Sequence, residues 1–514
     1  MVGYGYDSSE TKFLVASFRQ GFDLGYRGPV CNEAMNNLLS TRSRPEIMGQ
    51  LLGNEVEKGR ILGPFDRPPF TDFRVNPLGF VPKRTPGEYR LIVDLSQPKG
   101  HSVNSYIPPE LSSVSYPGIQ DAIDIILELH KQGYKPHLFK LDIKSAFRII
   151  PLNPQVFPLM GLQFDNKFFV NVFLPMGASS SCSIFQRFSD SVAFLLEKHA
   201  GVPHVLNYLD DFLGICLSYH NGQMSKSNSK VLGQKIRLPY AEDKEEGPAP
   251  VLVFIGIELD CVLLEARLPR EKIEKATSLI NNILKNPRVK SKRLEQLHGY
   301  LNYCAQIIPA GRAFLRSLSA IMFSKSQFIT VPKEVRLDLG VWLTFLNDFN
   351  GRAMFVTSDW DSEEVLTLET DSSGSWGCGA VLLGEYFSIP WNSNIPRGNL
   401  ALLELYPVVV ATHVWAEKLA NKRLIIRSDN MATVHIINKL KSSDSFTMTL
   451  VRLFALNQLK FNIWFQASHI PGALNVGPDL LSRDRVSEFL QLFPRARRIS
   501  PNLPQPLQQR NCLV

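Results

Sequence analysis

The feature that most constrains this chain is a pair of adjacent acids inside an apolar segment, Asp210 and Asp211 in VLNYLDDFLGIC. Such a segment favours a β-strand, in which a buried charge must be paired or bound to a cation. A hairpin with both acids at its tip resolves this conflict. Asp142 ends a second strand-like run, HLFKLD. Taken alone, the adjacent pair is equally compatible with a plain turn, and Asp142 with a helix cap.

A metal site forms if the hairpin tip lies against the end of the Asp142 strand. Three carboxylates would then converge, and hard oxygen ligands in that number suit Mg²⁺. Two such ions about 4 Å apart would clamp the attacking and leaving oxygens of a phosphoryl transfer. The Gly/Ser-rich segment LPMGASSSCSIFQ and the cations Lys83, Arg84 and Arg90, which lie around a predicted hairpin turn, also suit an anionic substrate.

Length and composition set outer limits. A chain of 514 residues implies about three or four domains, and 44% hydrophobic with 20% charged residues is globular composition. The net charge of +8 favours an anionic partner such as nucleic acid. The seven cysteines form no Cys-x-x-Cys pair, so neither a disulfide framework nor a zinc site is expected. With no signal sequence and no membrane-length apolar run, we expect an intracellular protein of the cytoplasm, the nucleus or both, not secreted and without a membrane partner.

The order of segments predicts an α/β and α+β multidomain fold. Strand-like and helix-like runs alternate from 118 to 217. The polar stretch from His220 to Lys230 predicts an exposed loop, and VLVFIGIELD (Val251 to Asp260) a single apolar strand. Two helical patterns follow, joined by the basic linker Lys285 to Arg293, which is expected to contact duplex phosphates or to be a solvated loop.

Three motifs in order resemble those of reverse transcriptases. YLDD (Tyr208 to Asp211) resembles the family's Tyr-x-Asp-Asp box, LDIKSAF its first palm motif, and LPMGASSSCSIFQ its Leu-Pro-Gln-Gly…Ser-Pro…Phe-Gln loop. The resemblance implies that Asp142, Asp210 and Asp211 hold two Mg²⁺, which Mn²⁺ can replace, helped by the carbonyl of Ile143. VFIGIELD is similar to the primer-grip segment that follows the palm.

The same resemblance implies contacts with a deoxynucleotide and its template. Phe147 corresponds to the aromatic gate that excludes a ribose 2′-hydroxyl, and Lys244 to the lysine that protonates pyrophosphate; the alternatives are a core phenylalanine and a solvated charge. Met176 and Cys182 replace the usual Gln and Pro, so contacts made by those side chains are not carried over. The implied substrate-binding residues are Lys83, Arg90, Phe147, Gly177, Tyr208 and Lys244.

A second set of acids lies on four separate predicted elements, Asp371, Glu404, Asp429 and Asp479. Each acid alone fits a turn, a helix surface or a cap, but four acids flanked by apolar residues are hard to explain as solvated charges. The set resembles ribonuclease H, which implies two Mg²⁺ and hydrolysis of the RNA strand of a hybrid. His469 then corresponds to a mobile histidine that assists product release, or is a structural histidine.

Together the motifs predict a right-hand polymerase with fingers, palm and helical thumb, followed by a ribonuclease H-like α/β domain. The predicted boundaries are 1–60 for an N-terminal extension, 61–262 for fingers and palm, 263–330 for the thumb, 331–365 for a connection, 366–493 for the ribonuclease H-like domain and 494–514 for a flexible tail.

The wording of FRQGFDLGYRGP, YRLIVDLSQPKGHSVN and IIPAGRAFLRSL most resembles DIRS-type retrotransposons, which pair this module with a tyrosine recombinase. We therefore expect an RNA- and DNA-directed DNA polymerase with a nuclease. The implied partners are an RNA template, a DNA primer, an RNA–DNA hybrid, deoxynucleoside triphosphates, an element-encoded recombinase and a coat-like protein. The alternatives are a decayed or domesticated template-primer-binding protein, a structural particle protein, and a telomerase- or intron-type reverse transcriptase, which lacks the appended nuclease.

Overall fold

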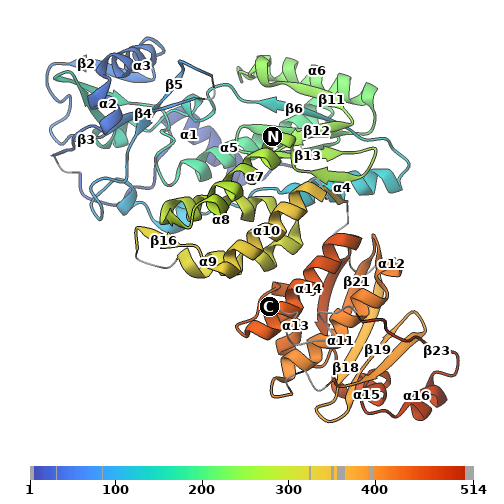
Figure 1. Cartoon of the computed structure of the whole chain (residues 1–514). Coiled ribbons are helices and arrows are strands. Elements are labelled where there is room, and N and C mark those ends of the chain that lie inside the picture. The colour runs from blue at the N-terminus through green and yellow to red at the C-terminus, as the bar shows by residue number, and fades with distance from the viewer. Residues whose placement is uncertain are drawn as a thin grey trace. The chain divides into compact units, whose positions relative to one another are not determined.

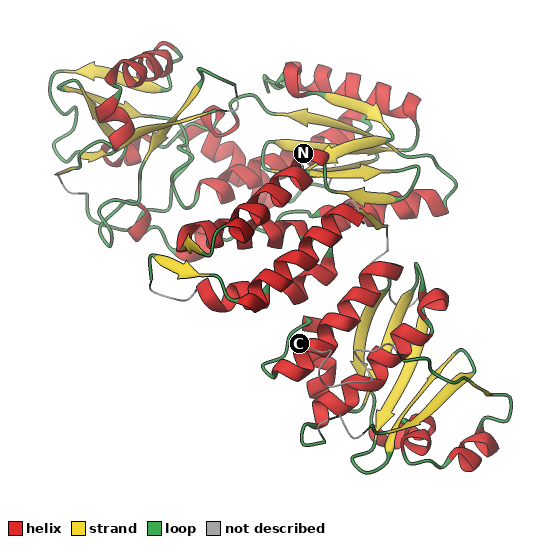
Figure 2. Cartoon of the chain, in the orientation of Figure 1, coloured by secondary structure: helices red, strands yellow, loops and turns green. Residues whose placement is uncertain are grey.

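The computed structural model describes residues 5–30, 32–83, 85–322, 326–348, 352–355, 360, 365–392, 395 and 397–503 (Figure 1). It forms two compact units, residues 1–255 and 256–514, which are described separately. Helices and strands are mixed in both units (Figure 2). None of the helices in the described part of the chain has the length and apolarity that a membrane crossing requires.

The first unit begins with a β-rich part. Its five-stranded sheet has the order β1-β3-β7-β8-β2, beside a separate antiparallel hairpin β4-β5. Met48 and Leu52 of α3 pack against Leu78 and Phe80 of the hairpin in one buried cluster. The elements are α1 (Ser8–Gln20), β1 (Glu33–Ala34), α2 (Leu39–Ser43), α3 (Pro45–Glu57), β2 (Ile61–Phe65), β3 (Arg74–Asn76), β4 (Leu78–Pro82), β5 (Tyr89–Val93), β7 (Gly161–Phe164) and β8 (Lys167–Asn171).

An antiparallel sheet of order β11-β6-β10-β9 forms the rest of the first unit. Along β6, Phe139 and Leu141 are buried in the core with Phe185 of α5, so Lys140 and Asp142 lie on the opposite face of the strand. The elements are α4 (Ile119–Lys131), β6 (His137–Asp142), α5 (Ser181–Ala200), β9 (His204–Tyr208), β10 (Asp211–Cys216), α6 (Tyr219–Lys235), β11 (Glu246–Ala249) and β12 (Val251–Phe254).

Helix α6 lies where an exposed loop was predicted, so that prediction is wrong. Its buried positions are occupied by small residues, Gly222, Ser225, Ser229 and Gly233, instead of apolar ones. A Cβ at Gly222 would lie 2.8 Å from the side chain of Pro248, so the close packing depends on that glycine. A helix that packs through glycine and serine carries no hydrophobic periodicity, which is why the sequence pattern resembled a loop.

The second unit begins with strands and a helical group. VLVFIGIELD is not one strand, because Ile255 and Gly256 adopt positive φ angles of 40° and 84° between β12 and β13. The basic linker contains a strand, β15, which pairs with β16 in a two-stranded ribbon. Trp342, Phe345 and Phe314 form the buried centre of the helices. The elements are β13 (Ile257–Asp260), β14 (Glu265–Arg267), α7 (Arg270–Lys285), β15 (Arg288–Lys290), α8 (Ser291–Cys304), α9 (Arg316–Met322), β16 (Phe328–Thr330), α10 (Lys333–Asp348) and β17 (Arg352–Met354).

A six-stranded sheet of order β22-β21-β18-β19-β20-β23 completes the second unit. β18, β19 and β20 are antiparallel, β21 is parallel to β18 and β22 to β21. β23 lies within the predicted tail, where Arg497 forms an ion pair with Glu385 of β20. The elements are β18 (Leu366–Ser372), β19 (Gly377–Leu382), β20 (Glu385–Pro390), α11 (Leu400–Val414), α12 (Ala416–Leu419), β21 (Arg423–Ser428), α13 (Met431–Lys439), α14 (Ser445–Phe461), β22 (Trp464–His469), α15 (Val476–Ser482), α16 (Val486–Leu492) and β23 (Arg497–Arg498).

Candidate active sites

The first acidic site lies where β6 ends and β10 begins. Asp142 and Asp211 are directly paired across these antiparallel strands. Leu209, at φ 54°, and Asp210 form the turn between β9 and β10, and the Ile143 N–H donates to the Asp210 carbonyl at 3.0 Å. The predicted hairpin with acids at its tip is confirmed, and the tip lies at the end of the Asp142 strand.

Burial dominates the electrostatics of this site. Desolvation raises the pKa of both Asp210 and Asp211, and the neighbouring Asp142 raises both further. One oxygen of Asp211, Oδ1, is buried and has no hydrogen-bond partner, although the Lys140 Nζ lies 3.6 Å away. A partly unsatisfied carboxylate beside two other acids fits a divalent cation.

Two lysines lie against these acids. Lys244 Nζ lies 2.9 Å from each carboxylate oxygen of Asp142. Lys140, two residues before Asp142 on the same strand face, also approaches Glu246 of β11 at 3.5 Å. The sequence reasoning did not single out Lys140; the signal available was its even spacing from Asp142 along a strand.

The remaining predicted substrate residues lie around the first site at different depths. Phe147 is 6% exposed and stacks on Phe185 with ring centres 4.9 Å apart. Tyr208 is exposed, with its ring 4.5 Å from that of Tyr116. A Cβ at Gly177 would lie 2.4 Å from the Val93 carbonyl oxygen, so a side chain there would push β5 away.

Two cations of the β4–β5 hairpin differ in their present contacts. Lys83 forms an exposed ion pair with Glu88 at 3.0 Å. Arg90 is exposed on β5 and lowers the pKa of Asp210 electrostatically, an effect smaller than burial. The structure therefore brings Arg90 within electrostatic reach of Asp210, whereas Lys83 is paired with Glu88. Arg84 lies outside the described residues.

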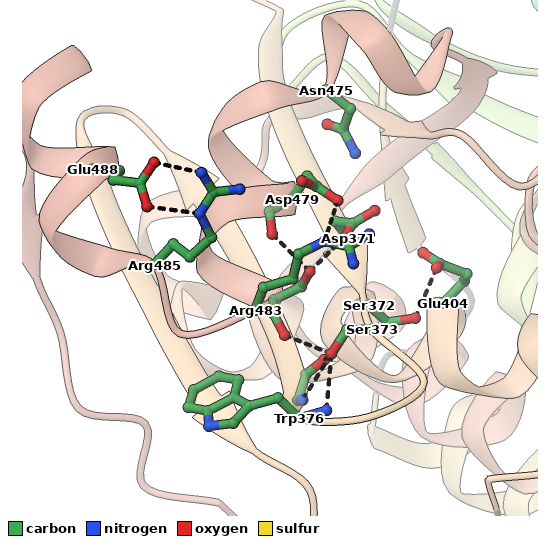
Figure 3. Close-up of polar contacts among 12 residues, drawn as sticks. Asp371, Ser372, Ser373, Trp376, Glu404, Asn475, Asp479, Arg483, Arg485 and Glu488 are labelled. Carbon is green, nitrogen blue, oxygen red and sulfur yellow. Dashed lines mark hydrogen bonds and ion pairs between the residues drawn. The ribbon is translucent and has the colours of Figure 1, made fainter.

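The second acidic site is built on the six-stranded sheet. Among the residues that the structure describes, Asp371 of β18, Glu404 of α11 and Asp429 after β21 offer ligand oxygens that all lie within 4.8 Å of one another. Figure 3 shows Asp371 between Glu404 and Asp479. Asp371 and Glu404 are buried, so three separate elements converge on one enclosed point.

The pKa of Asp371 is raised to about 7 and that of Glu404 to about 8, mainly by burial and in smaller part by neighbouring acids. Ser482 Oγ donates to Asp371 Oδ2 at 2.6 Å, and Ser372 Oγ donates to Glu404 Oε1 at 2.7 Å. The other Glu404 oxygen, Oε2, is buried without a hydrogen-bond partner. Crowded, buried acids with an unsatisfied oxygen are an arrangement that a divalent cation would relieve.

Two predicted residues lie at the edge of this group. Asp479 is not part of the set within 4.8 Å, and its Oδ1 accepts from Arg483 Nε at 2.8 Å. His469, the last residue of β22, is exposed and places Nε2 3.1 Å from the Asp429 carbonyl oxygen. The sequence reasoning missed Ser482 and Arg483, although they lie only three and four residues after Asp479.

The antiparallel sheet with acids at the β6–β10 end, the β-rich part before it and the helices after it define a right-hand nucleic-acid polymerase fold. Residues 81–247 match the profile of the family "reverse transcriptase (RNA-dependent DNA polymerase)". This stretch, which includes Asp142, Asp210 and Asp211, is therefore similar to a reverse transcriptase domain. None of the curated proteins matches the sequence.

Solved structures of foamy viral protease-reverse transcriptase resemble about nine tenths of this chain. The dRH structure in complex with double-stranded DNA has a TM-score of 0.50 at 15% identity, covering 91% of this chain and 79% of that chain. A second complex with double-stranded DNA has 0.49 at 15% identity, covering 91% and 94%. A complex with an RNA/DNA hybrid has 0.49 at 16% identity, covering 90% and 61%. At these identities the likeness concerns the fold alone.

Proposed function

We propose that this protein is an RNA- and DNA-directed DNA polymerase that also degrades the RNA strand of RNA–DNA hybrids. The observation that carries the polymerase is the direct pairing of Asp142 with Asp211 at the tip of the YLDD hairpin, inside the segment that matches reverse transcriptases. The nucleic-acid complexes of the foamy viral proteins agree with such a substrate.

In the polymerase site, Asp142, Asp210, Asp211 and the carbonyl of Ile143 would hold two Mg²⁺. Bound ions of this kind activate the attacking hydroxyl and neutralise charge on the leaving group. Lys244 must leave Asp142 for that binding and is then free to donate a proton to the departing pyrophosphate.

Three further residues would select and hold the nucleotide. Arg90, with Lys83 once it leaves Glu88, would bind the triphosphate. Phe147, fixed by its stacking on Phe185, has little freedom to move away from a ribose 2′-hydroxyl, which supports its role as the gate for deoxynucleotides.

The nuclease proposal rests on the second site. Asp371, Glu404, Asp429 and Asp479 would hold two Mg²⁺, with His469 at the exposed edge for product release. An antiparallel β18-β19-β20 sheet extended by parallel β21 and β22 supports a ribonuclease H-like domain. The hybrid made by the first reaction would be the substrate of the second.

Primer extension tests the polymerase. We expect full-length chain, Mg²⁺ and deoxynucleotides to extend a DNA primer on RNA and on DNA, and Asp210→Asn with Asp211→Asn to abolish extension. Asp165→Asn is the matched control, because this exposed residue has φ 49°, a conformation that asparagine tolerates. Binding of template-primer without extension by the unmodified chain would support the decayed-protein alternative.

Hybrid cleavage tests the nuclease separately. We expect Asp429→Asn to abolish cleavage of the RNA strand and to leave primer extension unchanged, with Asp484→Asn as the control. Equal loss of both activities would contradict two independent sites.

The proposed source is a DIRS-type retrotransposon, on the sequence phrases given above. Its recombinase and coat-like protein are partners of that element type. A neighbouring recombinase frame and terminal repeats in the genomic flanks are expected; flanks with another integrase type would overturn this assignment.

A further inference from the structure

Arg483 lies beside the acids of the second site, but the proposed nuclease reaction gives it no role. It follows α15 directly, and its Nε donates to Asp479 Oδ1 at 2.8 Å. It also lowers the pKa of Asp371 electrostatically, an effect smaller than those of burial and of Ser482. Its charge therefore acts on both Asp479 and Asp371, and Figure 3 shows the three residues close together.

The ion pair that holds Arg483 is weak enough to exchange. The Arg483 side chain is 55% exposed and the Asp479 side chain 37%, and an exposed pair at this helical spacing contributes little. A divalent cation bound by Asp479 would compete directly with the guanidinium for the same carboxylate. Once displaced, an exposed guanidinium at the rim of the acids would be free to bind an anion.

We propose that Arg483 is a phosphate-binding residue for the RNA–DNA hybrid, held on Asp479 until a cation at that carboxylate releases it. This inference rests on the proposed nuclease function. The guanidinium suits a phosphate oxygen because it presents planar, permanently charged donors. Cation binding and substrate binding would thus be linked through one side chain.

Arg485 provides a matched comparison two residues further on. It is also an exposed arginine, but its Nε donates to Glu488 Oε1 at 2.7 Å and its terminal nitrogen pairs with the other oxygen of Glu488. Two bonds to an acid outside the proposed metal site keep Arg485 engaged whether or not a cation is bound. Removing its charge is expected to leave cation-linked binding unchanged.

The test measures hybrid binding by fluorescence anisotropy with the full chain, over a range of salt, in EDTA and in Ca²⁺. We expect Arg483→Gln to weaken binding in Ca²⁺ about fivefold and to lower the salt slope by about 1, the signature of one lost phosphate contact. In EDTA the same variant should bind as the unmodified chain does. Arg483→Lys should retain the salt slope, and Arg485→Gln should behave as the unmodified chain in both conditions.

Two results would overturn the inference. Equal weakening by Arg483→Gln in EDTA and Ca²⁺ would show a contact that no cation controls, and no weakening in either would show that Arg483 does not bind the hybrid. Failure of the proposed function is distinguishable, because the unmodified chain would then not cleave the hybrid in Mg²⁺.

Discussion

Lys244 Nζ lies 2.9 Å from both carboxylate oxygens of Asp142 and thereby neutralises the acid that ends β6. Burial lowers the pKa of Lys244, but Asp142, Asp210 and Asp211 outweigh it and the net shift is upward. The lysine therefore remains protonated across the neutral range, as a donor to pyrophosphate must. Its side chain is 56% exposed, which leaves it room to move from Asp142 to a product.

We expect Lys244→Met to slow nucleotide incorporation about 100-fold at saturating nucleotide, the lower range for loss of a general acid. Lys244→Arg should restore part of the rate. Single-turnover incorporation measures this, with the exposed Lys235→Met as the control. A normal incorporation rate for Lys244→Met would show that Lys244 is not the proton donor and only pairs with Asp142.

Asp371 and Glu404 of the second acidic site predict that the stability of the fold falls as the pH rises. The pKa of Asp371 rises from 3.8 to about 7 and that of Glu404 from 4.5 to about 8. Between about pH 4 and pH 8 the folded state keeps protons that the unfolded chain has released, so its stability falls as pH rises through this window. At 1.36 kcal/mol for each pKa unit, the loss is on the order of 4 kcal/mol for each of the two acids.

Thermal unfolding in EDTA at pH 5.5 and pH 8.5 measures this effect. We expect a lower Tm for the second unit at the higher pH, and a larger gain from Mg²⁺ there, because bound cation replaces the lost protons. Asp371→Asn with Glu404→Gln should flatten the pH dependence, whereas the exposed Glu417→Gln should not. A Tm that rises with pH would contradict the assigned shifts.

The sequence predicted those features in which a residue conflicts with its local surroundings. Adjacent acids in an apolar segment required a hairpin tip, and the YLDD hairpin has that form. Helix α6 escaped prediction because its packing surface is Gly222, Ser225, Ser229 and Gly233, which leave no hydrophobic pattern. The roles of the individual acids remain predictions.

Contacts between residues far apart in the chain could not be predicted from the sequence. Lys244 meets Asp142 over 102 residues, and Ser482 meets Asp371 over 111. Both depend on how the elements pack. A serine and an arginine shortly after Asp479 form no sequence motif that indicates a role. The contact of Ser482 with Asp371 and the electrostatic effect of Arg483 on Asp371 depend on the packing of α15 against β18.

Ser482 is expected to orient Asp371. Its hydroxyl is fully buried and donates to Oδ2, a bond that lowers the pKa of Asp371 against the larger effect of burial. Ser482→Ala should slow hybrid cleavage about tenfold and move the rising limb of its pH profile to higher pH, because the acid loses a donor to its charged form. Cleavage rates from pH 6 to pH 9 test this, with the exposed Ser487→Ala as control. An unchanged profile would make Ser482 a packing residue.

The ribbon of β15 and β16 is expected to bind duplex phosphates. Val289 and Ile329 are paired and buried, so the alternating residues Arg288 and Lys290 point outward, and both cations lie within 6.0 Å of the Phe328 ring centre.

Because the buried pair would hold the ribbon's fold after substitution, Arg288→Gln with Lys290→Gln should remove charge without unfolding. Binding of template-primer should weaken for every sequence, and its salt slope should fall by about 2, one for each lost phosphate contact. Anisotropy titrations from low to high KCl measure the slope, with the exposed Lys333→Gln as a single-charge control expected to change it little. A salt slope equal to that of the unmodified chain would show that neither cation contacts a phosphate. Each phosphate contact releases counterions and therefore adds to the slope, whatever the sequence of the bound nucleic acid.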